Sequence, residues 1–306
     1  MVGVRSDWRS HVAEHFVKAS AYTQPYRERR CRNEAHPIDD FLFTYYHFSL
    51  AKVEAWHPSY DEFLPLEGDV DERSFFDEFP HFSKAPYRLE GVSNFNKRLV
   101  MDLSLMTDKQ RDFLGWIEDL LSQTANRAPN FGCFGLHEWA MVYGGQEVRH
   151  EKSTQLRLPQ EEIDALVNSR SLCCSHFDAF RFFAPQTVSK NRFSPTLETR
   201  SDHEQPACLH ANMDLYKWAF KAMPWVGSSL LWECFELALA GRELDMRASP
   251  YDLLKWGFEP IKVETNEGRE IYEKQQRELH QKAKVLREKL RSKIAGVLAA
   301  VELATA

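Results

Sequence analysis

This 306-residue chain lacks long apolar runs and an excess of basic residues. No stretch approaches the roughly 18 uninterrupted apolar residues that a membrane-spanning helix needs, so we expect no such helix. Residues 1–16 lack the apolar centre of a secretory signal. The chain has 39 Lys and Arg against 45 Asp and Glu, a net charge of −6. Proteins that grip a nucleic-acid backbone usually carry a basic surplus, so nucleic acid is a partner that we keep open but do not favour.

Cysteine is also scarce. Six cysteines in a chain of this length do not form a disulfide scaffold, and we expect reduced thiols in a cytoplasmic protein. Neither a glycine-rich phosphate-binding loop nor a G-x-S-x-G nucleophile turn occurs. Hydrophobic residues make up 43% of the chain and aromatic residues 13%, so the chain can bury a large core without disulfides or metal.

Helical spacing of apolar residues dominates the sequence. We expect residues 38–56 to form one buried helix or two short ones, and further helices at 107–121, 160–168, 212–223 and 228–244. Thr107 and Gln110 form a capping box at the start of the helix at 107–121. Residues 57–98, rich in proline, are expected to be irregular, and 256–263 to form a short strand. The predicted fold is mostly α, a multi-helix, bundle-like globular fold with irregular loops and at most a small sheet.

Three segments follow from this pattern. Residues 1–35 form a polar and basic N-terminal segment, and its arginines are expected to fray into solvent or to meet an anion. The main helical domain spans 36–264, with the candidate site in 131–252. The last segment, 265–306, is predicted to be a long amphipathic helix, because its apolar residues recur at spacings of three, four and seven.

Histidine and carboxylate residues recur close together in the region of the candidate site. His210 and Asp214 are four residues apart and would project from one face of a helix. His176 and Asp178 would point to the same side of a strand. Imidazole and carboxylate together suit a divalent transition metal. We therefore predict these four residues as metal ligands.

Further residues complete the predicted site. His137 and Glu138 are the candidate catalytic residues, and Arg181, Arg242 or Arg247 would hold the substrate. The expected ion is iron, whose open coordination positions would permit oxygen chemistry, or zinc, which would activate water. The hypothesis is a metal-dependent enzyme, with non-haem iron as the expected ion, that acts on a small polar or anionic substrate.

Other interpretations remain open. A structural zinc could be held by Cys174, His176, Cys208 and His210. Cys133 lies near His137 and could act with it as a nucleophile, although a small buried hydrophobe is the simpler interpretation of this cysteine. The protein could also be a non-enzymatic binding protein whose histidines and carboxylates form buried structural networks.

Five sequence blocks stand out together: RRCRNEAHPIDDFLFTYY, FGCFGLHEWAMVY, CSHFDAFRFF, EQPACLHANMDLYKWA and ELDMRASPYDL. In these blocks the chain resembles a bacterial family, common in actinobacteria, that is automatically labelled methyladenine DNA glycosylase. The resemblance implies a metal-free enzyme that extrudes a base and holds it in an aromatic, Asp-lined pocket. The chain lacks the glycine-rich hairpin with a following aspartate that helix-hairpin-helix glycosylases carry. We therefore take nucleobase glycosylase as the alternative function.

Overall fold

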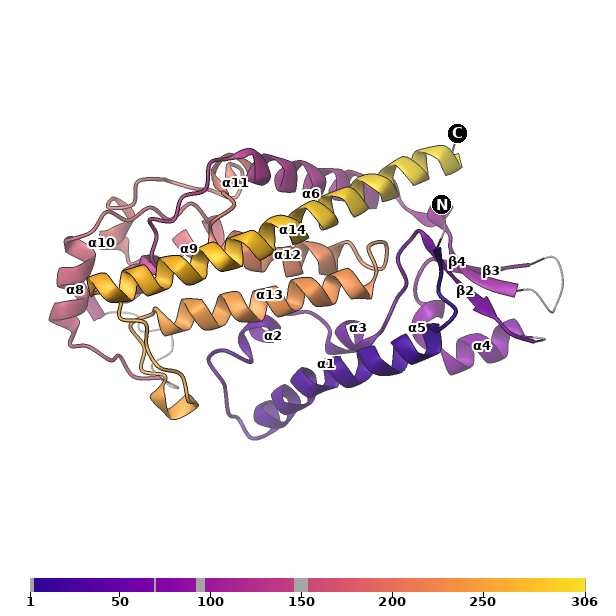
Figure 1. Ribbon diagram of the computed structural model, residues 1–306, viewed down its shortest axis with the longest axis horizontal. Coiled ribbons are helices and arrows are strands. Elements are labelled where there is room, and N and C mark those ends of the chain that lie inside the picture. Colours follow the sequence, from indigo (N-terminus) through magenta and orange to yellow (C-terminus); the bar gives the residue numbers. More distant parts are fainter. Residues whose placement is uncertain (1–2, 69, 92–96, 146–153, 306) are drawn as a thin grey trace.

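Three long helices form the centre of the fold: α12 (Leu209–Lys221), α13 (Ser228–Arg247) and α14 (Asn266–Thr305). The computed structural model describes residues 3–68, 70–91, 97–145 and 154–305. Helix α13 packs along α12 and α14, and α6 (Asp108–Asn126) packs on the outer side of α14 (Figure 1). The predicted mostly α-helical fold is confirmed.

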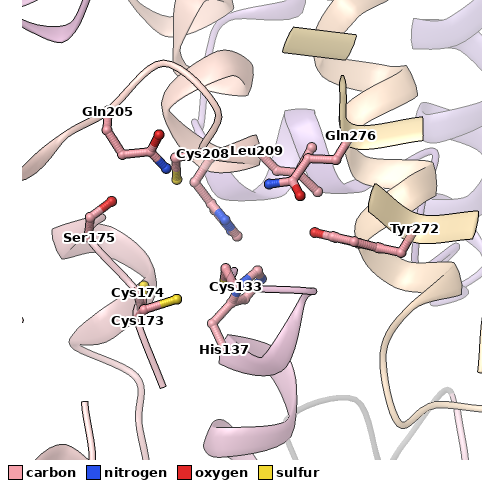
Figure 2. A pocket seen from close by; sticks show the side chains of 11 residues that line it. Cys133, His137, Cys173, Cys174, Ser175, Gln205, Cys208, Leu209, Tyr272 and Gln276 are labelled. Atoms are coloured by element: carbon pink, nitrogen blue, oxygen red, sulfur yellow. The ribbon is translucent and has the colours of Figure 1, made fainter. Parts of the chain in front are cut away.

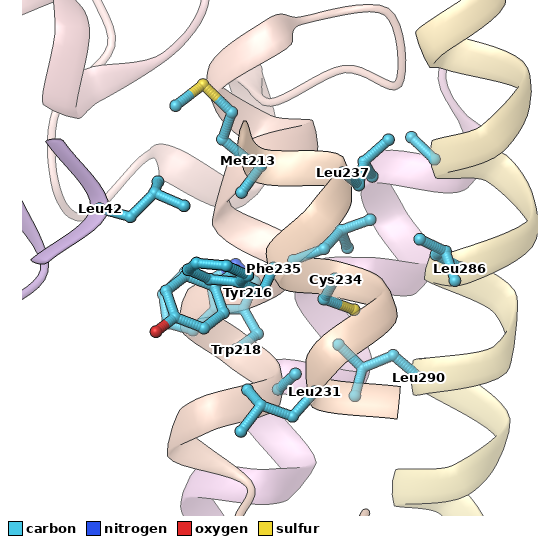
Figure 3. Packing of buried hydrophobic residues seen from close by; sticks show 14 of the residues in the cluster. Leu42, Met213, Tyr216, Trp218, Leu231, Cys234, Phe235, Leu237, Leu286 and Leu290 are labelled. Atoms are coloured by element: carbon cyan, nitrogen blue, oxygen red, sulfur yellow. The ribbon is translucent and has the colours of Figure 1, made fainter. Parts of the chain in front are cut away.

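Apolar side chains at helical spacing hold these helices together. Cys234 and Phe235 of α13 are fully buried, and they face different neighbours. Cys234 lies toward Leu290 of α14, while the Phe235 ring packs 5.2 Å from the ring of Tyr216 on α12 (Figure 3). Burying a side chain of this size stabilises the fold by about 1.5–3 kcal/mol. Helix α13 is therefore buried on two sides, which explains why its middle carries so few charges.

The remaining helices surround this centre. Their bounds are α1 Trp8–Cys31, α2 Phe41–Tyr45, α3 Leu50–Glu54, α4 Glu72–Glu78, α5 Pro80–Ser83, α7 Leu136–Met141, α8 Gln160–Asn168, α9 Phe177–Phe180, α10 Pro185–Val188 and α11 Arg200–His203, with 3₁₀ turns η1 Leu103–Leu105, η2 Tyr143–Gly145 and η3 Leu254–Trp256. The predicted capping box of α6 is confirmed, since the Thr107 hydroxyl accepts a hydrogen bond from the Gln110 backbone and the Gln110 side chain accepts one from the Thr107 backbone.

A four-stranded sheet lies at one end of the molecule, in the order β1 (Gly3–Val4), β2 (Glu62–Leu66), β4 (Lys97–Met101), β3 (Tyr87–Glu90). Only the β1–β2 pair is parallel. The expectation of at most a small sheet is thus met. Strands β2 and β3 and the start of β4 come from the segment expected to be irregular, where prolines and charged residues obscure the alternation of Leu64 and Leu66, which point into the core.

The N-terminal segment is more ordered than its polarity suggests. Trp8, Ala19 and Tyr26 are buried along one face of α1, and His15 and Thr23 lie buried on the same face. Because two of the five buried positions carry polar residues, the apolar residues of α1 alone do not show a helical spacing. The burial nevertheless fixes α1 against the rest of the fold.

The arginines at the end of α1 meet carboxylates of the chain itself. Arg27 binds Glu54 through both terminal nitrogens, and Arg29 Nε lies 2.9 Å from Asp40 Oδ1. Asp40 is buried, so its pairing with Arg29 joins the end of α1 to the start of α2. No external anion is needed to explain this basic run.

The predicted strand at 256–263 is wrong. Its first residue ends the 3₁₀ turn η3, and Gly257 has a φ of 82°, a left-handed conformation that interrupts an extended chain. Pro260 supplies no backbone N–H for a strand ladder.

None of the helices in the described part of the chain is both long and apolar enough to cross a bilayer.

Candidate functional site

Three residues from separate elements converge at one end of the helical centre: His137 on α7, His210 on α12 and Asp245 on α13. One ligand atom from each lies within 4.8 Å of the others, and all three side chains are buried. His137 Nε2 lies 2.8 Å from Asp245 Oδ1, and the His137 and His210 rings are 4.6 Å apart. We call this set the first group. It combines two imidazoles with one carboxylate.

The path of the chain before α7 brings His137 to this point. Phe134 and Gly135 both have left-handed backbone conformations, with φ of 48° and 71°, so the chain reverses just before the helix starts. The Trp139 indole nitrogen then donates a hydrogen bond to the carbonyl of Ala248, 2.9 Å away, which ties α7 to the end of α13. His137 therefore faces Asp245 across this junction.

A second group lies beside the first and consists of His176, Glu204 and Asp214, also buried and also within 4.8 Å of one another. His176 Nε2 lies 3.3 Å from Asp214 Oδ2 and 3.5 Å from Glu204 Oε1. The Tyr46 hydroxyl donates to Asp214 Oδ1 at 2.8 Å. The His176 and His210 rings are 5.4 Å apart, so the two groups are neighbours.

The two groups differ in the cations that already neutralise them. In the second group, Lys217 Nζ lies 3.1 Å from Asp214 and Arg200 Nε lies 3.3 Å from Glu204. In the first group, the one neighbouring arginine that forms an ion pair in the described structure is Arg242, which lies 3.0 Å from Asp245 and also binds Glu138. A divalent cation therefore meets fewer lysine and arginine side chains in the first group.

Burial and neighbouring charges shift the pKa values of these residues. Burial lowers the pKa of His210 to about 3, with His137 adding to the effect, so the His210 ring is neutral. Burial also opposes charge on His137, but Asp245 and Cys133 outweigh it and raise the pKa of His137. Burial and then the nearby Asp245 raise the pKa of Glu138. In the first group the His210 ring is thus neutral, whereas the His137 ring binds a proton more readily than a free imidazole.

The histidine rings also differ in their hydrogen bonds. Within the described part of the chain, neither ring nitrogen of His210 takes part in a hydrogen bond. In the second group, His176 Nδ1 and Glu204 Oε1 are buried without a hydrogen-bond partner among the described residues. A buried polar atom without a hydrogen-bond partner lowers the stability of the fold and is rare, so it indicates a bound ligand or water at that position.

A cavity of about 10 Å³ adjoins the first group, room for about one water molecule or ion. His137 and His210 line it together with four of the six cysteines, Cys133, Cys173, Cys174 and Cys208. Figure 2 shows Tyr272 and Gln276 reaching in from α14. Cys133 Sγ lies 3.4 Å from His137 Nδ1, so both nitrogens of this ring have a neighbour.

The four expected metal ligands do not gather around one point. His210 belongs to the first group, while His176 and Asp214 belong to the second. Asp178 lies in neither, and its carboxylate instead pairs with Arg200 and Lys217. The reason is local: α9 begins directly after His176, so Asp178 sits in the first turn of a helix, where the same-side spacing of a strand does not apply.

The expected zinc ligands are placed differently too. Among the described residues, Cys174, His176, Cys208 and His210 do not form a converging set. The Cys174 thiol donates to the backbone carbonyl of His176, and Cys174 and Cys208 line the cavity with His210. The structure therefore gives the cysteines a place beside the first group rather than a tetrahedral site of their own.

The predicted substrate-binding arginines have other partners. Arg242 is 1% exposed, stacks on the Phe41 ring at 3.8 Å and holds two carboxylates, so it is part of the interior. Arg247 binds Glu243 at 3.1 Å. Arg181 lies over the Phe182 ring, with Asp178 at 3.5 Å. None of the three is among the described residues that line the cavity.

Glu138 lies next to the first group without joining it, since its carboxylate is bound to Arg242 at 3.1 Å. Sequence reasoning missed the roles of Glu204 and Tyr46, because no spacing relates them to a histidine. Only its position just after the predicted helix 228–244 pointed to Asp245 as a site residue.

Comparisons of the chain with protein-family models, curated proteins and solved structures found no match.

Proposed function

We propose that the protein is a metal-dependent enzyme whose ion is bound by His137, His210 and Asp245. The observation that carries this proposal is the approach of their ligand atoms to within 4.8 Å, from three separate segments. Ligands of one ion lie about 3–4 Å apart, because metal–ligand bonds are near 2 Å, so only a small closure is required. The lack of a hydrogen bond to His210 within the described part of the chain supports the same role.

Two imidazoles and one carboxylate favour iron. Non-haem iron enzymes use this set of ligand types, and an ion held by three protein ligands would keep positions for oxygen and substrate. The adjoining cavity, which His137 and His210 line, would give room for such a ligand beside the ion. Zinc is the second choice, and it would activate a water for hydrolysis. We propose a small polar or anionic substrate in either case.

Arg242 and Glu138 would act as positioning residues. Arg242 lies between Asp245 Oδ2, at 3.0 Å, and Glu138 Oε1, at 3.1 Å. A hydrogen bond to the carboxylate's second oxygen holds its first oxygen toward His137 and the ion. Neither residue needs to touch the substrate for this function.

The glycosylase that the resemblance implies has less support. It needs a pocket that holds a whole extruded base. The cavity at the first group has a volume of about 10 Å³, which suits a water or an ion, and the hollow of about 200 Å³ beside it has no aspartate among its described lining residues. We therefore keep metal-dependent chemistry as the proposed function.

Metal analysis of protein purified without oxygen or chelators tests the proposal. We expect about one equivalent of a transition metal, and restoring the metal to chelated protein at about 100 times its Kd should raise the free energy of unfolding by about 2.7 kcal/mol. Failure of Fe²⁺, Mn²⁺ and Zn²⁺ alike to bind or to stabilise the chelated protein would refute the proposal.

A second candidate function uses the cavity thiol. Cys133 Sγ lies 3.4 Å from His137 Nδ1, and the opposite ring nitrogen lies 2.8 Å from Asp245. This is the order of nucleophile, base and orienting carboxylate found in cysteine hydrolases. The sulfur would attack the carbonyl carbon of an ester or amide while its proton passes to His137 Nδ1. The C–O or C–N bond would then break, the leaving group would take that proton, and water would hydrolyse the thioester.

Alkylation distinguishes the two functions. If Cys133 is an activated nucleophile, it should react with iodoacetamide at least about 10-fold faster than the exposed Cys31, and His137→Gln should remove this difference. Mass spectrometry of both cysteines in chelated protein gives the rates. If Cys133 reacts more slowly than Cys31 and the protein binds metal, the nucleophilic role of Cys133 is excluded and the metal-dependent function is retained.

A further inference from the structure

A hollow of about 200 Å³ adjoins the turn that carries Cys133. Gly132 and Phe134, which flank Cys133, line the hollow, whereas Cys133 itself lines the cavity of the first group. The other described residues that line the hollow are Leu136, Arg170, Ser171, Val263 and Arg269. One turn of the chain therefore borders both spaces.

Two guanidinium groups give the hollow a positive charge. Arg170 follows helix α8, is exposed, and forms no ion pair or hydrogen bond within the described part of the chain. Arg269 is held in place from the other side, because its Nη1 donates to the carbonyl of Val263 at 3.0 Å and its Nη2 to the side chain of Asn266. The described lining includes no carboxylate.

The carboxylate that directly follows the lining residue Val263 is already engaged. Glu264 follows Val263, but both of its oxygens are bound by Arg157, at 2.6 and 2.7 Å. It therefore does not neutralise Arg269. In the described structure neither Arg170 nor Arg269 forms an ion pair, although Glu267 and Glu270 lie close to Arg269 in the sequence, and guanidinium groups suit carboxylate and phosphate oxygens.

The remaining wall of the hollow is apolar. Leu136 and Val263 are buried side chains, and Phe134 offers an aromatic ring. We propose that the hollow binds a small molecule that carries a carboxylate or phosphate on a mainly apolar body, and that this molecule is the substrate of the neighbouring site. The second part rests on the proposed function; the binding itself does not depend on a metal.

Equilibrium binding to chelated protein tests this inference, with benzoate and phenyl phosphate as the anions and benzamide as a neutral match for benzoate. We expect saturable binding of at least one anion, and at least about 10-fold weaker binding of benzamide. Arg170→Gln should weaken anion binding about 10- to 100-fold, because it removes a charged hydrogen-bond donor without breaking an internal pair. The tighter of the two anions identifies the oxyanion.

Arg73→Gln is the matched control. Arg73 is 91% exposed on α4, at the opposite end of the molecule from α8 (Figure 1), and its loss changes the net charge equally. It should alter binding less than about twofold. Anions that do not bind, or that bind Arg170→Gln as tightly as the unchanged protein, would overturn the inference. If anion binding depends on Arg170 in a protein that binds no metal, the binding inference holds and the proposed metal-dependent function is refuted.

Discussion

Replacing His210 by alanine is expected to weaken metal binding by at least about 100-fold, because losing a direct ligand costs more than the 10- to 100-fold loss typical of a residue that merely supports one. His210 suits this test, since it forms no hydrogen bond within the described part of the chain, so its loss breaks no internal pair. Competition between the protein and a coloured chelator for Zn²⁺ or Co²⁺ measures the change in Kd.

Glu204→Gln provides the comparison for the second group. The substitution keeps the shape of the side chain and removes its charge, and Glu204 is a member of the second group only. We expect this variant to keep its metal, with a Kd within about threefold of the unchanged protein. The reverse pattern, with metal kept by His210→Ala and lost by Glu204→Gln, would move the ion to His176, Glu204 and Asp214.

Arg242→Met is expected to lower the free energy of unfolding by about 3–5 kcal/mol. The side chain is 1% exposed and neutralises both Glu138 and Asp245. Its removal leaves two buried carboxylates beside one another, and an uncompensated buried charge is among the most destabilising changes in a protein interior. Urea unfolding followed by tryptophan fluorescence measures the loss.

Two further variants separate this effect from a general loss of charge. Arg247→Met removes a partly exposed arginine that is paired with Glu243, and it should cost only about 1 kcal/mol or less. Adding Glu138→Gln to Arg242→Met should recover part of the stability, since one of the stranded charges disappears. A stable Arg242→Met protein with a selective defect in substrate binding would instead restore the substrate-binding role that the sequence suggested.

The pair His210 and Asp214 illustrates how far spacing can predict a site. Both lie on α12, one helical turn apart and both buried, as the spacing predicts. They nevertheless serve different groups, because His210 meets α7 and α13 while Asp214 meets His176 and Tyr46. Spacing determines which face of a helix a side chain occupies, and the neighbouring elements determine what it meets there.

Sequence periodicity alone determined the helical class, the long C-terminal helix and the capping box of α6, because these depend on contacts between residues a few positions apart. Tertiary structure decided which histidines share carboxylates, since Asp245 reaches His137 across 108 positions. It also decided that Arg242 is buried among acids and that Arg170 and Arg269 face one hollow. Such pairings depend on how whole helices pack against one another, and a side chain carries no local signal of the partner it will meet.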